Sequence, residues 1–140
     1  PAGGLADPDA PARRMPKRVL PYDPYVKAYA SPPWKAQPTA FFSCDVFEHL
    51  PVEALRDLAR QLCKARSVTR AYVVLATRAA TKTMPNGVNA HLTVRPADWW
   101  HGFFDGAMGN HYRVALATSD LAAGEAVFGL VRVALPAEGA

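Results

Sequence analysis

The distribution of proline constrains this chain more than any other feature of its sequence. Nine of its 13 prolines fall within the first 40 of 140 residues. Proline fixes the backbone φ angle and lacks the amide proton that helices and sheets use, so this region cannot hold a long helix or a central strand. It offers one short strand candidate, at residues 18–20. We therefore divide the chain into a proline-rich segment, 1–38, and an α/β core, 39–140.

Regular structure is expected in the core, beginning with a strand–helix–strand unit. An apolar run at 40–46 predicts a strand buried on both faces, and a β-branched run at 71–77 predicts a second strand. Between them, apolar side chains recur every three or four residues and predict a helix over 51–66. A unit of this length favours a right-handed crossover between two parallel strands.

The second half of the core predicts a loop, a helix and a hairpin. The polar segment 77–95 carries a turn signal at 85–87, and a loop of this length is more often functional than idle. A short amphipathic helix is expected at 96–104. Two closing strands, near 112–117 and 126–135, are separated by a short turn that favours an antiparallel hairpin. The whole pattern predicts an α/β fold with a mostly parallel sheet.

Charge and composition limit the partners of the chain. The net charge is +4 and the pI is about 9.3, which suits an anionic partner, and a basic cluster at 13–18 allows nucleic-acid binding. No apolar run reaches the roughly 20 residues of a spanning helix, so no membrane partner is expected. The two cysteines, Cys44 and Cys63, are too few for a disulfide framework. We interpret them as buried reduced thiols, which fits a cytoplasmic location.

Acidic and imidazole side chains follow the predicted strands, where ligands of open α/β sheets bind. Asp23 lies 19 residues after Gly4, close to the interval at which nucleotide-binding folds place a ribose-binding acid. Its alternative role is that of an ordinary turn aspartate between two prolines. Asp45, Glu48 and His49 lie between a strand and a helix, where polar groups can converge on a ligand. The alternative is that Glu48 and His49 satisfy the backbone at the helix entrance.

Several segments resemble one enzyme family. The motif DVFEHLP at 45–51, followed by a helix and YVVLAT at 72–77, resembles the segment after strand 4 of class I S-adenosylmethionine-dependent methyltransferases of the type-11-like branch. VLPYDP at 19–24 resembles the strand-2 motif of that family, and NAHLT at 89–93 resembles a segment found in a bacterial and phage subgroup. The resemblance covers most of 18–135. It implies a truncated Rossmann-like methyltransferase sheet, mostly parallel, with a C-terminal antiparallel hairpin.

The resemblance implies methyl transfer from S-adenosylmethionine to an unidentified acceptor. Its cofactor-binding residues would be Gly3, Gly4, Asp23, Asp45, Val46 and Phe47. His49 would be the general base, with Glu48 beside it and His91 as a second candidate, because imidazole exchanges a proton readily near neutral pH. Asn89 and Trp99 would bind the substrate. Because Trp99 and Trp100 are adjacent, at most one indole can face the core.

The chain also departs from the family pattern. Strand 1 and the start of the glycine-rich loop are absent, and residues 1–7 resemble only the end of that loop. We therefore expect a fragment, a processed product or a natural truncation. This departure favours an alternative function, a non-catalytic methyltransferase-like subunit of a larger assembly. A protein partner would then cover the sheet edge that the missing strand leaves open.

A metal site is the remaining hypothesis. Glu48, His49 and His91, together with His101 or His111, supply oxygen and imidazole ligands. Their spacing matches no tight ligand motif. Adjacent residues such as Glu48 and His49 should also point in different directions on a helix or strand. The sequence therefore predicts no metal.

Overall fold

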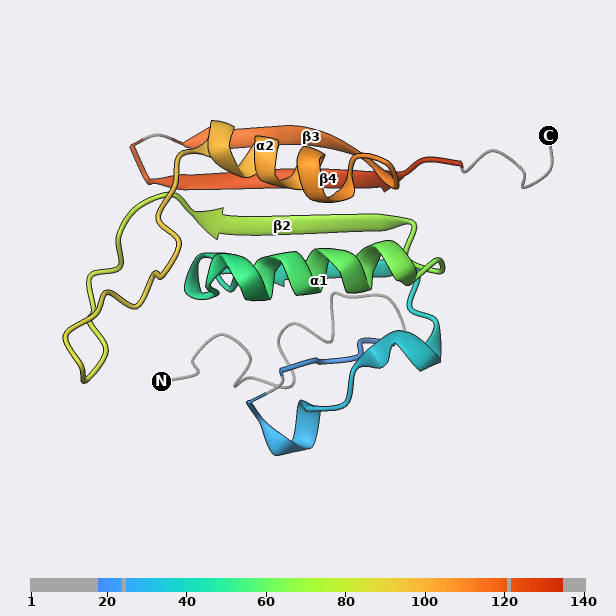
Figure 1. Cartoon of the computed structure of the whole chain (residues 1–140), viewed down its shortest axis with the longest axis horizontal. Coiled ribbons are helices and arrows are strands. Elements are labelled where there is room, and N and C mark those ends of the chain that lie inside the picture. The colour runs from blue at the N-terminus through green and yellow to red at the C-terminus, as the bar shows by residue number, and fades with distance from the viewer. Residues whose placement is uncertain (1–17, 24, 121, 135–140) are drawn as a thin grey trace. The chain divides into compact units, whose positions relative to one another are not determined.

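The computed structural model describes residues 18–23, 25–120 and 122–134 (Figure 1), which belong to two compact units, Pro1–Pro38 and Thr39–Ala140. In the described part of the first unit, two short 3₁₀ helices, η1 (Lys27–Tyr29) and η2 (Pro33–Ala36), are the regular elements. The strand expected at 18–20 does not form there. Proline density explains this result, because each proline removes a donor that a strand ladder needs.

The second unit contains a four-stranded mixed sheet. Its order is β1-β2-β4-β3, and β1 and β2 are parallel while the β2–β4 and β3–β4 pairs are antiparallel. The prediction of a truncated Rossmann-like, mostly parallel sheet was wrong, whereas the C-terminal antiparallel hairpin is confirmed. The reason is that the hairpin supplies half of the sheet: β4 pairs antiparallel with β2, and β3 pairs antiparallel with β4. The strands are β1 (Ala40–Cys44), β2 (Arg70–Ala76), β3 (Tyr112–Asp120) and β4 (Glu125–Arg132).

Two helices cover one face of this sheet (Figure 1). Helix α1 (Val52–Lys64) buries a stripe of side chains at intervals of three and four residues. Helix α2 (Ala97–Met108) buries a stripe at intervals of four residues. Helix α2 extends four residues beyond its predicted end because Met108 continues the stripe of Trp100 and Phe104. No helix in the described ranges has the length and apolar character needed to cross a membrane.

The sheet is apolar on both faces but covered on one. Alternate residues of β2 and β4, such as Val73 and Phe128, point toward the helices and are buried. Their neighbours on the opposite face include Phe42, Tyr72 and Val131, which are about half exposed. The expectation that the first strand is buried on both faces was therefore wrong, because both helices pack on the same side.

A half-buried arginine joins α1 to the end of the hairpin. The Arg132 guanidinium donates hydrogen bonds to the carbonyl oxygens of Val68 (2.8 Å), Leu62 (2.9 Å) and Ala65 (3.1 Å), and to the Tyr112 hydroxyl (2.6 Å). Burial raises the pKa of Tyr112, and the positive charge of Arg132 partly opposes that rise. The planar guanidinium thus adds a charged donor at carbonyls of the last turn of α1 and the following turn, two of which also accept from the Tyr112 hydroxyl.

We expect Arg132→Met to lower the free energy of unfolding by about 2–3 kcal/mol, because several part-buried carbonyls lose a charged donor. Urea denaturation followed by circular dichroism measures the change. Arg113→Met is the matched control, since Arg113 is exposed on the neighbouring strand β3 and should change stability by less than about 0.5 kcal/mol. Equal losses in the two variants would contradict the role assigned to Arg132.

Candidate metal centre

The one parallel strand pair brings two loops to the same edge of the sheet. β1 ends at Cys44, and Asp45 then adopts φ +53° while its amide donates to the carbonyl of Val74 at 3.0 Å. Aspartate tolerates this left-handed conformation better than most residues. The sharp turn leads into the short 3₁₀ helix η3 (Phe47–His49). The segment after β2 leaves the sheet at the same edge, as the strand–helix–strand prediction required.

Glu48 is buried at the junction of these two loops. Its side chain is fully buried, and its Oε1 accepts a hydrogen bond from the backbone amide of Ala76, at the end of β2, at 3.0 Å. Its backbone carbonyl accepts from the amide of Thr93 at 3.0 Å. The second carboxylate oxygen, Oε2, is buried and has no hydrogen-bond partner in the described part of the chain. Burying a carboxylate is unfavourable unless a partner compensates it, so Oε2 marks a place for a positive ligand.

Two histidines lie beside Glu48 with fixed ring orientations. His49 Nδ1 is 2.8 Å from the carbonyl oxygen of Ala90, and His91 Nδ1 is 2.6 Å from that of Arg78. A carbonyl only accepts hydrogen bonds, so each Nδ1 must donate. In the neutral ring this leaves Nε2 unprotonated, with a lone pair for a proton or a metal ion. The ring centroids are 4.7 Å apart and the rings are nearly perpendicular, at 87°.

Glu48, His49 and His91 form one group of potential ligands. One ligand atom from each residue lies within 4.8 Å of the other two. The expectation that Glu48 and His49 would diverge does not hold, because a ligand atom of each lies within 4.8 Å of the other, although the two are neighbours in η3. One carboxylate with two imidazoles is a ligand set of catalytic zinc and non-haem iron sites. His101 and His111 are outside this group among the described residues.

Asn89 positions His91. Its Oδ1 accepts from the amides of Ala80 (3.0 Å) and His91 (2.9 Å), and its Nδ2 donates to the Ala80 carbonyl at 2.9 Å. The amide group predicted to bind substrate is therefore occupied in holding the loop. Thr93 has a similar role, since its hydroxyl donates to the Leu50 carbonyl at 2.7 Å. Sequence reasoning missed Thr93 because its partners are more than 40 residues away in the chain.

His91 is also held by the carbonyl of Arg78, and the turn of the β3–β4 hairpin supports Arg78. The Arg78 guanidinium donates through Nε to the carbonyl of Ala123 at 3.0 Å, and the amide of Thr77 donates to that of Gly124 at 2.7 Å. Gly124 has φ +66°, and a Cβ at this position would lie 2.8 Å from the Arg78 side chain. Glycine is required here for its backbone angle and for the close approach of Arg78.

The structure describes four of the six predicted cofactor-binding residues, three of them in the second unit. Asp45 and Val46 are exposed beside the cluster, whereas Phe47 is buried in the core with its ring 5.8 Å from that of Phe104. Asp23 belongs to the first unit, where its Oδ1 accepts the amide of Tyr25 at 2.9 Å, as the turn-aspartate alternative predicts. Its role as a ribose-binding acid stays a prediction. Gly3 and Gly4 lie outside the described residues.

The tryptophan pair divides between core and surface. Trp100 is fully buried, while Trp99 is half-buried, so only one indole faces the core. Trp99 stacks on Phe103 with centroids 5.6 Å apart and 12° between the planes, and the Arg95 guanidinium lies 5.5 Å from the Trp99 centroid. The Trp99 ring therefore makes these contacts with side chains that are close to it in the sequence. Its role in substrate binding stays a prediction.

The cysteines do not add a thiolate ligand to the cluster. Cys44 is exposed, so the expectation that it is buried was wrong, and Cys63 is half-buried. Partial burial of the sulfur and the negative charge of Asp45 raise the pKa of Cys44. Burial likewise raises the pKa of Cys63. Both shifts favour the protonated thiol, which is a poor nucleophile and metal ligand.

We expect Asn89→Ala to speed amide hydrogen exchange at residues 80 and 91, because both amides lose their acceptor. Hydrogen-exchange mass spectrometry measures this change. Asn86→Ala is the control within the same loop, since Asn86 Oδ1 accepts only the nearby amide of Val88, at 3.1 Å, and its loss should stay local. Unchanged protection at residues 80 and 91 in Asn89→Ala would remove Asn89 from the support of His91.

Comparisons with known proteins do not place this chain in a family. No protein-family model matches it, and searches of curated proteins and of solved structures give no significant match.

Proposed function

We propose that Glu48, His49 and His91 bind a divalent transition-metal ion, and that this centre serves methyl transfer from S-adenosylmethionine. The observation that carries the metal site is the convergence of one ligand atom from each residue within 4.8 Å, at a glutamate whose Oε2 is buried without a partner among the described residues. The methyl-transfer part is supported by the resemblance of residues 45–51 to the methyltransferase motif.

The electrostatics favour a cation over a neutral ligand. The Glu48 carboxylate is fully buried, and the ion pair found among the described residues, Arg60–Asp57, does not involve it. The two imidazoles add lone pairs without adding charge when they are neutral. A divalent ion would compensate the carboxylate. Imidazole ligands favour zinc, iron or nickel over magnesium and calcium, which prefer oxygen.

Three protein ligands leave room for a further ligand, as catalytic metal sites require. A divalent cation lowers the pKa of a hydroxyl or water that binds it, and S-adenosylmethionine supplies an activated methyl group. The chain would orient the acceptor, whose proton would pass to water, because both ring nitrogens of each histidine would already be engaged. His49 is the exposed member of the cluster and is therefore the residue best placed to meet an acceptor from solvent. Exposed apolar side chains of the same two loops, Val46 and Leu92, would contact its apolar part.

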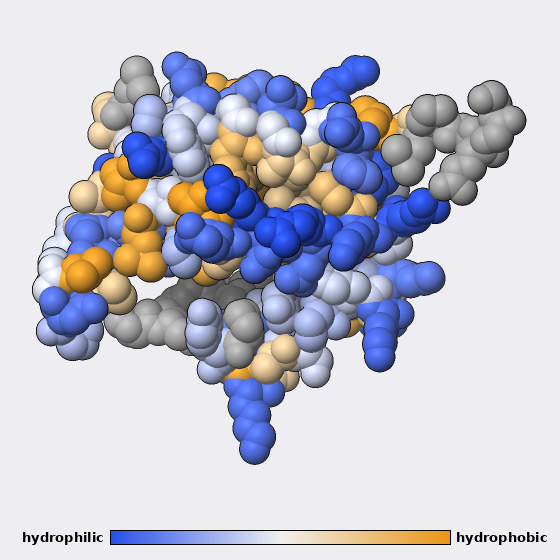
Figure 2. Space-filling model, in the orientation of Figure 1, coloured by the Kyte–Doolittle hydropathy of each residue, from blue (hydrophilic) through white to orange (hydrophobic). Residues whose placement is uncertain are grey.

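The loop that carries His91 presents apolar surface to a possible acceptor (Figure 2). Orange patches lie over the loop between β2 and α2, on the left of the view, and the exposed face of α1 is hydrophilic. Val88, Leu92 and Val94 of this loop are each more than two-fifths exposed. Apolar surface around a few polar groups is typical of small-molecule sites.

We expect the wild-type chain to bind Zn²⁺ or Ni²⁺ with a stoichiometry of one in isothermal titration calorimetry, and Mg²⁺ more weakly. Glu48→Gln should weaken Zn²⁺ binding by about tenfold or more, because the anionic ligand is lost. Glu53→Gln removes the same charge from the exposed first turn of α1 and should leave binding unchanged. Affinity should fall at acidic pH, because a protonated imidazole has no lone pair for the metal.

Equal Zn²⁺ affinity in wild type and Glu48→Gln, with both chains folded by circular dichroism, would exclude the centre. His49→Gln and His91→Gln test the other two ligands in the same titration, with His101→Gln as the histidine control. Loss of binding in the control alone would place the metal elsewhere.

We expect S-adenosylhomocysteine to give measurable heat with the wild-type chain and less with Asp45→Asn. Asparagine tolerates the positive φ of residue 45, so this variant removes the charge while keeping the turn. Unaltered heat in Asp45→Asn would remove Asp45 from the cofactor site. Absence of heat in the wild type, with Zn²⁺ binding intact, would instead favour the non-catalytic alternative, so the two parts of the proposal fail separately.

A further inference from the structure

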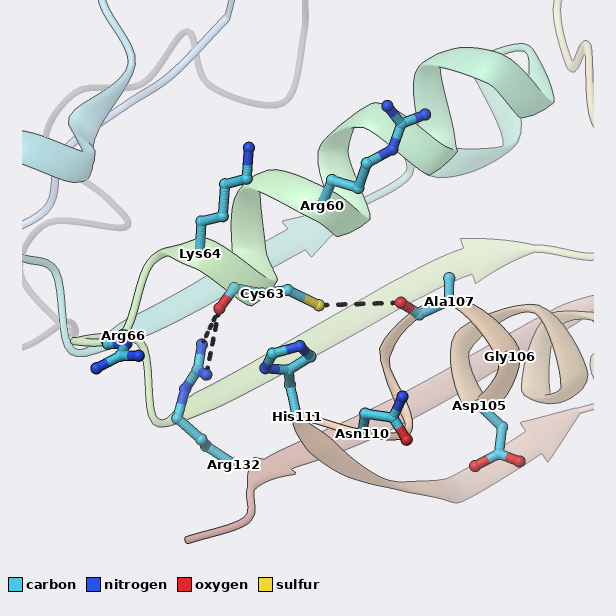
Figure 3. Close-up of a pocket in the computed structure, with 10 residues that line it drawn as sticks. All are labelled: Arg60, Cys63, Lys64, Arg66, Asp105, Gly106, Ala107, Asn110, His111 and Arg132. Carbon is cyan, nitrogen blue, oxygen red and sulfur yellow. Dashed lines mark hydrogen bonds between the residues drawn. The ribbon is translucent and has the colours of Figure 1, made fainter. Parts of the chain in front are cut away.

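A surface pocket lies at the opposite end of α1 from the metal centre. Glu48 and His49 directly precede α1, whereas this pocket is formed around its C-terminal turn, the end of α2 and the adjoining strand ends (Figure 3). A helix of 13 residues is about 20 Å long, so the two sites are separate. The pocket has a volume of about 510 Å³, within the range of small-molecule sites. Its lining residues used below are Arg60, Lys64, Arg66, Asp105, His111 and Arg132.

The walls of this pocket carry more positive than negative charge. Lys64 and Arg66 are exposed cations that have no carboxylate within ion-pair distance among the described residues. Arg60 is paired with Asp57 at 3.1 Å, but both side chains are more than three-fifths exposed, so water screens this pair and leaves it weak. Asp105 supplies the one carboxylate of the lining.

Arg132 removes the main obstacle to an anion at this place. The C-terminal end of a helix carries partial negative charge on its free carbonyls, which would repel an anion. Here the carbonyls of Leu62 and Ala65 accept hydrogen bonds from the Arg132 guanidinium at 2.9 and 3.1 Å. With these carbonyls covered, Lys64 and Arg66 add positive charge at the rim of the pocket, where Figure 3 shows their side chains extending away from His111. Arg66 and Arg132 also line an adjacent hollow of about 350 Å³, so the cationic surface continues beyond the first pocket.

His111 provides a second, independent indication. Its Nδ1 is buried and has no hydrogen-bond partner in the described part of the chain. Figure 3 shows its ring in the middle of the pocket, between the Arg132 side chain and the end of α2. Unpartnered buried polar atoms are uncommon in folded proteins and often mark a missing ion or ligand.

We propose that this pocket binds the phosphate group of a nucleotide-sized ligand. Phosphate is the anion whose several oxygens match an ammonium and a guanidinium together, because lysine attracts it as a point charge and arginine donates paired hydrogen bonds. The pocket, at about 510 Å³, has room for a further group attached to the phosphate. The site is distinct from the proposed metal centre and does not depend on it.

The test is NMR titration of the whole chain, labelled with ¹⁵N, with adenosine 5′-monophosphate as the probe. Shifts should concentrate at residues 60–66 and 105–111. Adenosine, which lacks the phosphate, should bind about tenfold more weakly or worse, since charge-assisted hydrogen bonds are lost. Inorganic phosphate should shift the same residues with lower affinity. Saturation by inorganic phosphate at the same concentration as the nucleotide would contradict a nucleotide-sized ligand.

Paired charge variants separate this pocket from diffuse attraction to a basic protein. Lys64→Gln with Arg66→Gln should weaken adenosine 5′-monophosphate binding about tenfold or more. Arg70→Gln with Arg113→Gln removes the same charge from exposed positions on β2 and β3 and should leave it within about twofold. Equal weakening in both double variants, or no shift at millimolar nucleotide, would overturn the proposal. All four side chains are exposed, so folding should be preserved.

Discussion

The hydrogen bond between the Glu48 carboxylate and the amide of Ala76 connects the two halves of the candidate centre. It spans the gap between the loop after β1 and the end of β2, and it is made by a fully buried side chain. Glu48 also holds Thr93 through its backbone carbonyl, so the segment carrying His91 returns to the same place. A carboxylate suits this task because its two oxygens can serve two purposes. One oxygen organises the backbone while the other remains for a cation.

The location of the centre was predictable even though the fold class was not. The sequence predicted a parallel pair with a crossover helix, and this pair alone is enough to place residues 45–49 and 77–91 at one edge. The rest of the strand order depended on which strand the hairpin would pair with. Strand β4 reads as a continuous apolar run in sequence, and such a run does not reveal which neighbour it will pair with.

The finer geometry of the centre was beyond sequence reasoning for a different reason. The orientation of each imidazole depends on a carbonyl of another loop residue, Ala90 for His49 and Arg78 for His91. These acceptors are backbone atoms and leave no mark in residue identity. Glu48 and His49 belong to a three-residue 3₁₀ helix, and such short elements have weak sequence signals. Asn89 was singled out as a substrate ligand, and that role stays a prediction; in the structure its side chain supports the loop.

The contact between Gly124 and Arg78 means that the hairpin tip is not a neutral place for change. Tips of exposed hairpins usually accept insertions, because little packs against them. Here the tip receives the Arg78 side chain, and the Arg78 carbonyl in turn orients His91. Lengthening that turn, or grafting a tag or domain into it, would therefore alter the imidazole that lies about 30 residues earlier in the chain. A circular permutation opened at this tip would carry the same penalty, so fusion designs should use other loops.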